Sequence, residues 1–227
     1  MCPQPDPAPR PVFRLPLTEG KIVVYSFGKG EKVMICLHGF DDHGISFQKW
    51  ESTYGDEYTL YAPDLPFHGQ STWNRRWMDQ VDVISIINAI LLKIECADYV
   101  LTGHSYGARL ILCAVPDFDH LPRKVILLAP GGIGTYDKVP PLWLQQVLEW
   151  SLRWPAWLQL GVNVGRKLGL ISKFHQRYAE AQLYPPQQRW RLFRVFHSLL
   201  YFPTDTARIR NFWTTNATAC LVVVAEK

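Results

Sequence analysis

Short apolar runs alternate with amphipathic stretches over the first 130 residues. The runs from Lys32 to Leu37 and from Lys124 to Leu128 are almost continuously apolar, as in strands buried on both faces. Residues Met78 to Ile94 instead have apolar positions at helical spacing. This alternation predicts an α/β fold, with a mostly parallel central sheet flanked by helices. The expected strands are Phe13–Leu17, Lys21–Phe27, Lys32–Leu37, Tyr58–Ala62, Asp98–Thr102 and Lys124–Leu128, and the expected helices are Ser46–Tyr54, Met78–Ile94 and Ser105–Val115.

The strand pattern stops after residue 136 and returns once near the end. Residues 137–215 are rich in tryptophan and punctuated by proline, which predicts several short helices. Ala219 to Ala225 is again a strand pattern. We therefore expect a core over 13–136, a helical cap inserted over 137–215, and a return to the sheet over 216–227. Proline at alternate positions predicts a disordered tail over residues 1–12.

Composition and charge narrow the function classes. The chain has a net charge of +4, but residues 135–215 contain 11 Lys and Arg against 4 Asp and Glu, so the basic charge is concentrated there. There is no apolar run of about 18 residues, so we expect no transmembrane segment. Five cysteines without metal-like spacing predict buried free thiols, no metal site and a cytoplasmic location. The Arg189–Arg194 stretch is too sparse to indicate nucleic-acid binding.

The strongest chemical motif is Gly103-His104-Ser105-Tyr106-Gly107, between a predicted strand and a predicted helix. A G-x-S-x-G sequence in this context is a nucleophile elbow, in which a tight turn lifts the serine hydroxyl above the sheet edge. Glycines two places either side allow the turn to close. The first turn of the new helix directs backbone N–H groups toward developing negative charge. Ser105 is therefore the candidate nucleophile.

With two further motifs, the chain resembles the α/β-hydrolase superfamily, in the serine branch with a helical cap. His38-Gly39-Phe40 follows the strand 32–37 and resembles the oxyanion segment of that family. The resemblance implies an oxyanion hole formed by the backbone N–H groups of Phe40 and Tyr106. The sequence Asp64-Leu65-Pro66-Phe67-His68-Gly69-Gln70-Ser71 resembles the family's D-x-P-G-H-G-x-S loop, with Phe67 in place of the usual glycine.

The family's order of catalytic residues is serine, then a carboxylate, then histidine. Neither partner has a strong candidate in this sequence. Asp137 is a weak candidate for the acid, and the family's usual position for it would follow Glu226-Lys227. We expect both the acid and the base to lie beyond Lys227, in a chain that stops early. The alternative is a non-catalytic binding protein with the same fold. We expect structural roles for His38, His68 and His104, a place on the far side of the sheet for His120, and places in the cap for His175 and His197.

The serine at the elbow also indicates a reaction class. Related dehalogenases and epoxide hydrolases normally use aspartate there, so Ser105 favours hydrolysis of an ester or a related acyl substrate, without a cofactor. The tryptophan-rich, basic cap favours an apolar or lipid-like small molecule, or peripheral contact with an anionic membrane surface. A packed lid whose arginines face water explains the same composition without a ligand.

Overall fold

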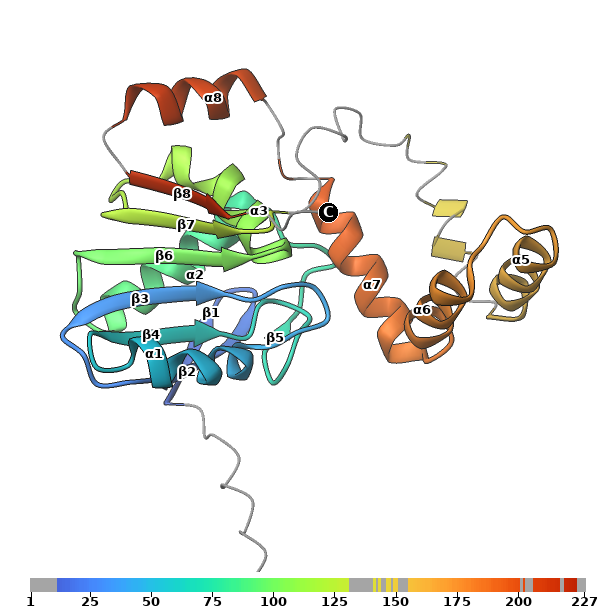
Figure 1. Ribbon diagram of the computed structural model, residues 1–227, viewed down its shortest axis with the longest axis horizontal. Coiled ribbons are helices and arrows are strands. Elements are labelled where there is room, and N and C mark those ends of the chain that lie inside the picture. Colours follow the sequence, from blue (N-terminus) through green and yellow to red (C-terminus); the bar gives the residue numbers. More distant parts are fainter. Residues whose placement is uncertain are drawn as a thin grey trace, which may run out of the picture. The chain divides into compact units, whose positions relative to one another are not determined.

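The computed structural model describes residues 12–130, 155–200, 202, 206–216 and 219–223, together with positions 141, 143, 146, 147, 149 and 150. Its strands form one sheet, shown in Figure 1. The strands are β1 (Phe13–Leu17), β2 (Gly20–Phe27), β3 (Lys32–Leu37), β4 (Tyr58–Pro63), β5 (Thr72–Trp73), β6 (Tyr99–His104), β7 (Lys124–Leu128) and β8 (Ala219–Val223). The α-helices are α1 (Glu51–Tyr54), α2 (Gln80–Lys93), α3 (Tyr106–Ala114), α5 (Pro155–Lys167), α6 (Lys173–Leu183), α7 (Pro186–Leu199) and α8 (Thr206–Thr215), and the 3-10 helices are η1 (Gly44–Trp50) and η2 (Val115–Asp117).

The sheet confirms the predicted fold class. Its order is β1-β2-β4-β3-β6-β7-β8, antiparallel from β1 to β4 and parallel from β4 to β8. The two-residue strand β5, which the apolar pattern did not indicate, pairs with β2. Helix α3 packs on β6, β7 and α2. One hydrophobic cluster of the core is centred on β2, β3 and β4, and its fully buried members include Val23, Cys36, Leu60 and Ala62. Fully buried apolar side chains also lie on α2, α3, β6 and β7.

Contacts divide the chain into two compact units, which we describe separately. The first comprises Met1–Asp137 and Phe202–Lys227, and the second comprises Lys138–Tyr201. Helix α8 thus belongs to the sheet-bearing unit, where Arg208 forms an ion pair with Asp117 of η2. The second unit is therefore shorter than the segment 137–215, and its role as a cap stays a prediction.

The cysteines differ in part from the expectation of buried thiols. Cys36 and Cys113 are buried, whereas Cys96 is half-buried and Cys220 is exposed. The prediction was wrong for Cys220 because β8 is the edge strand of the described sheet, and both of its faces are exposed. No helix in the described ranges is both long enough and apolar enough to span a membrane.

The loop after β4 is organised by the buried carboxylate of Asp64. Its two oxygens accept the backbone N–H groups of Gly44 at 2.8 Å and Gln70 at 2.7 Å. Its own carbonyl accepts the Ser71 hydroxyl at 2.7 Å, and that hydroxyl accepts the Val23 N–H at 2.8 Å. Asp64 therefore ties the loops after β3 and β4 to each other and to β2.

We expect Asp64→Asn to lower the free energy of unfolding of the first unit by about 2–4 kcal/mol, because the new NH₂ group faces a backbone donor and leaves it unpaired. Urea unfolding followed by circular dichroism measures this. The matched control is Asp98→Asn, which changes a 71% exposed carboxylate that pairs with Arg123 at 3.5 Å. That substitution should cost less than about 1 kcal/mol, and equal losses in the two variants would contradict the role of Asp64.

Candidate active site

The topology places a switch point between the carboxyl ends of β3 and β6. The chain passes from β3 to β4 on one side and returns to β6 on the other side of β3, so the strand order reverses between β3 and β6. These two strands are paired in parallel from Val33 with Tyr99 to Leu37 with Gly103. In open α/β sheets such a switch point leaves room for a ligand at the carboxyl ends of the strands.

Ser105 occupies this position, between the end of β6 and the start of α3. Its backbone has φ 48° and ψ −103°, a strained conformation for a residue with a side chain. Its N–H donates to the Leu128 carbonyl of β7 at 2.8 Å, and its carbonyl accepts the Arg109 N–H at 3.1 Å. The turn is therefore held by hydrogen bonds on both sides, and the half-buried serine is fixed at the carboxyl end of β6.

Two glycines allow this turn to close, as the motif predicts. A Cβ atom added at Gly103 would lie 2.6 Å from the backbone nitrogen of Ala108. A Cβ atom at Gly107 would overlap the carbonyl of Leu37 and lie 2.7 Å from that of His38. Helix α3 thus begins in direct backbone contact with the end of β3.

The first turn of α3 supplies backbone donors near the carboxyl ends of β3 and β6. The Gly107 N–H donates to the His38 carbonyl at 3.1 Å. The N–H of Tyr106, the first helical residue, has no hydrogen-bond acceptor among the described residues. A helix N-terminus favours negative charge, so this N–H is suited to an oxyanion.

His38 fixes the peptide that would carry the second donor. The Leu65 N–H donates to His38 Nε2 at 2.9 Å, so this nitrogen carries a lone pair. The proton is therefore on Nδ1, which donates to the Gly39 carbonyl at 2.7 Å. In a trans peptide the N–H points away from the C=O, so the Phe40 N–H faces away from the Gly39–His38 hydrogen bond.

Gly39 brings the predicted oxyanion segment next to Ser105. A Cβ atom added there would lie 3.6 Å from Ser105 Cβ and 2.9 Å from His104 Nδ1. The predicted motif residues from β3 and β6 therefore meet at one place. The loop after β4 joins them through His68, whose ring lies 6.1 Å from those of both Phe40 and Tyr106.

Among the described histidines, exposed His104 adjoins Ser105, and its Nδ1 lies 2.9 Å from the position of a Cβ atom added at Gly39, whereas His43, His120 and His197 have contacts of their own. His43 is exposed, with Nδ1 3.4 Å from Asp42. The carbonyl of His120 accepts the hydroxyl of Tyr99, the first residue of β6, so His120 lies near the opposite end of that strand from the elbow. His197 is buried in the second unit and stacks on Phe193.

No hydrogen bond joins the Ser105 hydroxyl to a histidine within the described part of the chain. Asp137 and Glu226 lie outside the described residues. The sequence predictions for the acid and the base therefore stay predictions. A cluster of three or more potential metal-ligating side chains is also absent from the described ranges.

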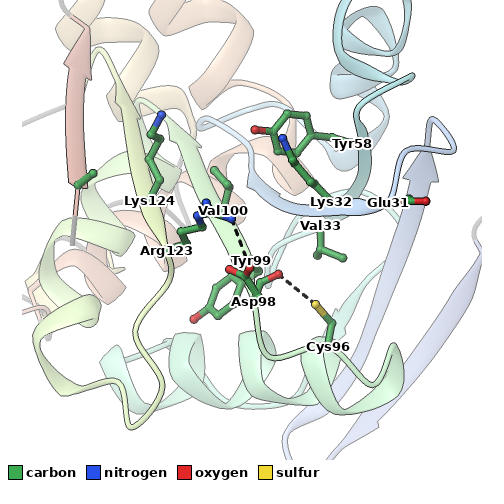
Figure 2. Close-up of a pocket in the computed structure, with 11 residues that line it drawn as sticks. Glu31, Lys32, Val33, Tyr58, Cys96, Asp98, Tyr99, Val100, Arg123 and Lys124 are labelled. Atoms are coloured by element: carbon green, nitrogen blue, oxygen red, sulfur yellow. Dashed lines mark hydrogen bonds and ion pairs between the residues drawn. The ribbon is translucent and has the colours of Figure 1, made fainter. Parts of the chain in front are cut away.

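A separate cavity of about 710 Å³ opens at the other end of the strands, shown in Figure 2. Its walls include Lys32, Tyr58, Asp98, Arg123 and Lys124. These residues lie at or near the starts of β3, β4, β6 and β7. The cavity is therefore at the amino ends of the strands, whereas Ser105 follows the carboxyl end of β6. Lys32 pairs with Glu57 at 2.6 Å and Arg123 with Asp98, so most of these charges are balanced locally.

Comparisons with known sequences agree with this geometry. Residues 34–226 match the model of the alpha/beta hydrolase family. The chain is 33% identical over 104 residues to the uncharacterized hydrolase YugF of Bacillus subtilis, covering 45% of this chain and 38% of that protein. It is 27% identical over 124 residues to a probable serine hydrolase of Drosophila melanogaster, covering 53% and 38%. The matched part thus spans less than two fifths of the length of either relative.

Solved structures share the fold at low sequence identity. The thioesterase domain from the curacin biosynthetic pathway has a TM-score of 0.63 and 18% identity, covering 93% of this chain and 82% of that one. A putative epoxide hydrolase from Pseudomonas aeruginosa has a TM-score of 0.60 and 14% identity, covering 93% and 77%. The family model matches most of this chain, and the strand order and the strained turn at Ser105 agree with that match. This chain belongs to the alpha/beta hydrolase family.

Proposed function

We propose that this chain carries the nucleophile and the oxyanion hole of a serine hydrolase that cleaves an ester or a related acyl bond. The observation that supports this most directly is Ser105 at φ 48°, at the start of a helix and beside Gly39. A strained turn persists only where the surrounding structure holds it, and such turns cluster at functional sites.

In the proposed reaction, Ser105 Oγ adds to the carbonyl carbon of the substrate while a base takes the hydroxyl proton. The carbonyl oxygen becomes an oxyanion, which accepts hydrogen bonds from the N–H groups of Phe40 and Tyr106. Collapse of this intermediate breaks the acyl bond, and the leaving group departs with the proton. Water then repeats the sequence on the acyl-serine, releasing the acid and restoring Ser105. The base comes from outside the described residues.

The identity of the elbow residue supports acyl chemistry over epoxide opening. A serine ester is hydrolysed by the same addition and collapse that forms it. The names of the relatives, a hydrolase and a probable serine hydrolase, are in line with this choice. The second unit has 9 Lys and Arg against 2 Asp and Glu and several tryptophans, which supports an apolar acyl group, with anionic character or a lipid surface nearby.

A non-catalytic binding protein is the alternative. The strained serine, beside a Tyr106 N–H that has no acceptor among the described residues, favours catalysis over a simple binding surface. Trapping of an acyl-serine distinguishes the two functions.

We expect Ser105 of the 1–227 chain to form a covalent acyl adduct with 4-nitrophenyl butyrate, and added imidazole to accelerate it. Imidazole is a diffusible base with a near-neutral pKa. It replaces the general base, which the described residues do not place beside Ser105. Intact-mass and peptide mass spectrometry after timed quenching measure the adduct.

Ser105→Ala is the control for this experiment, because imidazole also hydrolyses the ester directly. The proposal fails if no adduct forms on Ser105 with or without imidazole. It also fails if the adduct mass appears equally in the Ser105→Ala variant.

Without added imidazole, we expect the 1–227 chain to turn over the same ester no more than about tenfold faster than its Ser105→Ala variant. Loss of the base leaves a protonated hydroxyl, and removing triad members costs about 10⁴–10⁶ in kcat in a well-studied protease. Release of 4-nitrophenol measures this. Fast turnover that disappears in Ser105→Ala would show that a base lies within residues 1–227, with Asp137, His175 and His197 as the first positions to test.

Two glycine substitutions separate folding from catalysis. Gly39→Ala places its methyl group 3.6 Å from Ser105 Cβ, and its closest neighbour is the movable ring of exposed His104. We expect this variant to fold but to form the Ser105 adduct at least about tenfold more slowly, because the methyl group enters the acyl site. Gly107→Ala overlaps backbone carbonyls of β3 and should destabilise the first unit by at least about 2 kcal/mol.

Thermal unfolding and the adduct assay are measured on both variants, with Gly161→Ala as the control. A Cβ atom at Gly161 meets nothing within 4 Å, so that variant should retain both the stability and the rate. If Gly39→Ala reacted at the normal rate, the oxyanion segment would not border the acyl site.

A further inference from the structure

His68 lies in the loop after β4, and the sequence predicted a structural role for it. Its side chain is 1% exposed. Its Nδ1 lies 2.9 Å from the Pro66 carbonyl; since a carbonyl only accepts, this nitrogen carries the proton. The neighbouring residue Phe67 has φ 70°, so the loop adopts a strained turn to bring the His68 ring inward.

The His68 ring contacts both residues whose backbone N–H groups form the proposed oxyanion hole. It meets the Phe40 ring edge-on, with centroids 6.1 Å apart at 87°. It meets the Tyr106 ring at 6.1 Å and 35°. It also packs edge-on against His38, at 5.0 Å, the residue that fixes the Gly39–Phe40 peptide. One ring thus joins the three elements that shape the hole: the end of β3, the loop after β4 and the start of α3.

The second ring nitrogen of His68 has no bonding role in the described structure. Its Nε2 is buried without a hydrogen-bond partner among the described residues, and so is the neighbouring Tyr106 hydroxyl. Burial lowers the pKa of His68, against smaller opposing effects of the Pro66 carbonyl and of Asp64 and Asp42, which favours a neutral ring. Toward Phe40 and Tyr106, His68 therefore acts through the shape of its ring.

We propose that His68 is a positioning residue whose ring, wedged between the side chains of Phe40 and Tyr106, sets the separation of the two oxyanion-hole N–H donors. The donors come from segments 66 residues apart in the sequence. The backbone hydrogen bond from Gly107 to the His38 carbonyl joins these segments, and the contacts of the His68 ring with Phe40 and Tyr106 form a second link that bears on the donors to the precision a catalytic site needs, about 0.5 Å. This inference rests on the proposed function for its catalytic consequence, but its geometric content stands apart from it.

Two substitutions distinguish a wedge from a polar anchor. His68→Phe keeps an aromatic ring and removes the bond to Pro66, whereas His68→Asn keeps a polar group near the Nδ1 position and removes the ring. Crystal structures of the 1–227 chain and both variants measure the distance between the backbone nitrogens of Phe40 and Tyr106. We expect this distance to be unchanged in His68→Phe and altered by at least 0.5 Å, about the positioning tolerance of a catalytic site, in His68→Asn.

The imidazole-assisted acylation of Ser105 gives the second readout. In His68→Asn we expect the limiting acylation rate to fall about 10²-fold, the effect of losing one oxyanion donor, while the half-saturating ester concentration stays within about twofold. His68→Phe should restore the rate to within about threefold of the unmodified chain. Phe40→Ala keeps the Phe40 N–H but removes the ring that His68 contacts, so it should also lower the acylation rate. In the double variant with His68→Asn, the two losses should be less than additive.

The outcomes separate the two proposals. Unchanged donor separation in His68→Asn, or equal rate losses in His68→Asn and His68→Phe, would overturn the role of His68. If His68→Asn does not fold, the Phe40→Ala structure decides the question, because an unmoved donor pair there also overturns it. If the unmodified chain forms no Ser105 adduct, the proposed function fails, and the crystal structures alone decide whether His68 sets the donor separation.

Discussion

The site depends on the close approach of two backbones, the end of β3 and the first turn of α3. The Gly107 N–H donates to the His38 carbonyl at 3.1 Å, and this contact leaves no space for a side chain at position 107. Because β3 and β6 are paired as far as Leu37 and Gly103, the chain has to turn sharply to bring the first turn of α3 against the end of β3. That sharp turn is what forces the strained conformation of Ser105 and lifts it above the sheet.

A second constraint acts on the oxyanion segment through hydrogen bonds of defined direction. His38 accepts the Leu65 N–H with Nε2 and donates from Nδ1 to the Gly39 carbonyl, so the tautomer of a fully buried ring follows from its two partners. Leu65 in turn is held by the loop that Asp64 organises. The orientation of one peptide in the site is thus linked to a buried carboxylate on a different loop, which explains why the loop after β4 carries polar residues although it supplies none of the proposed reacting groups.

The parts of the site that the sequence predicted are those that local geometry determines. Gly103, Ser105 and Gly107 lie within five residues, and their spacing, together with their position between a predicted strand and a predicted helix, indicated the turn. The sheet could be predicted from apolar runs, because buried parallel strands need them. The strand β5 was missed, since two residues, Thr72 and Trp73, give no period to detect. The exposure of Cys220 was missed because an apolar run indicates that a strand is suited to burial, not which neighbours cover it.

The side-chain contacts of the site were harder to predict from the sequence, because they join residues that are distant in it. The sequence around His68 does not indicate that its ring reaches both Phe40 and Tyr106, since that depends on the positive φ of Phe67 and on the packing of three loops.

The same reasoning applies to the catalytic base. Backbone donors are supplied by the turns that also build the sheet, so folding of the core places them. Under the proposed function, the core places the two oxyanion donors, and a histidine acting as the base would need side-chain packing of its own to reach Ser105.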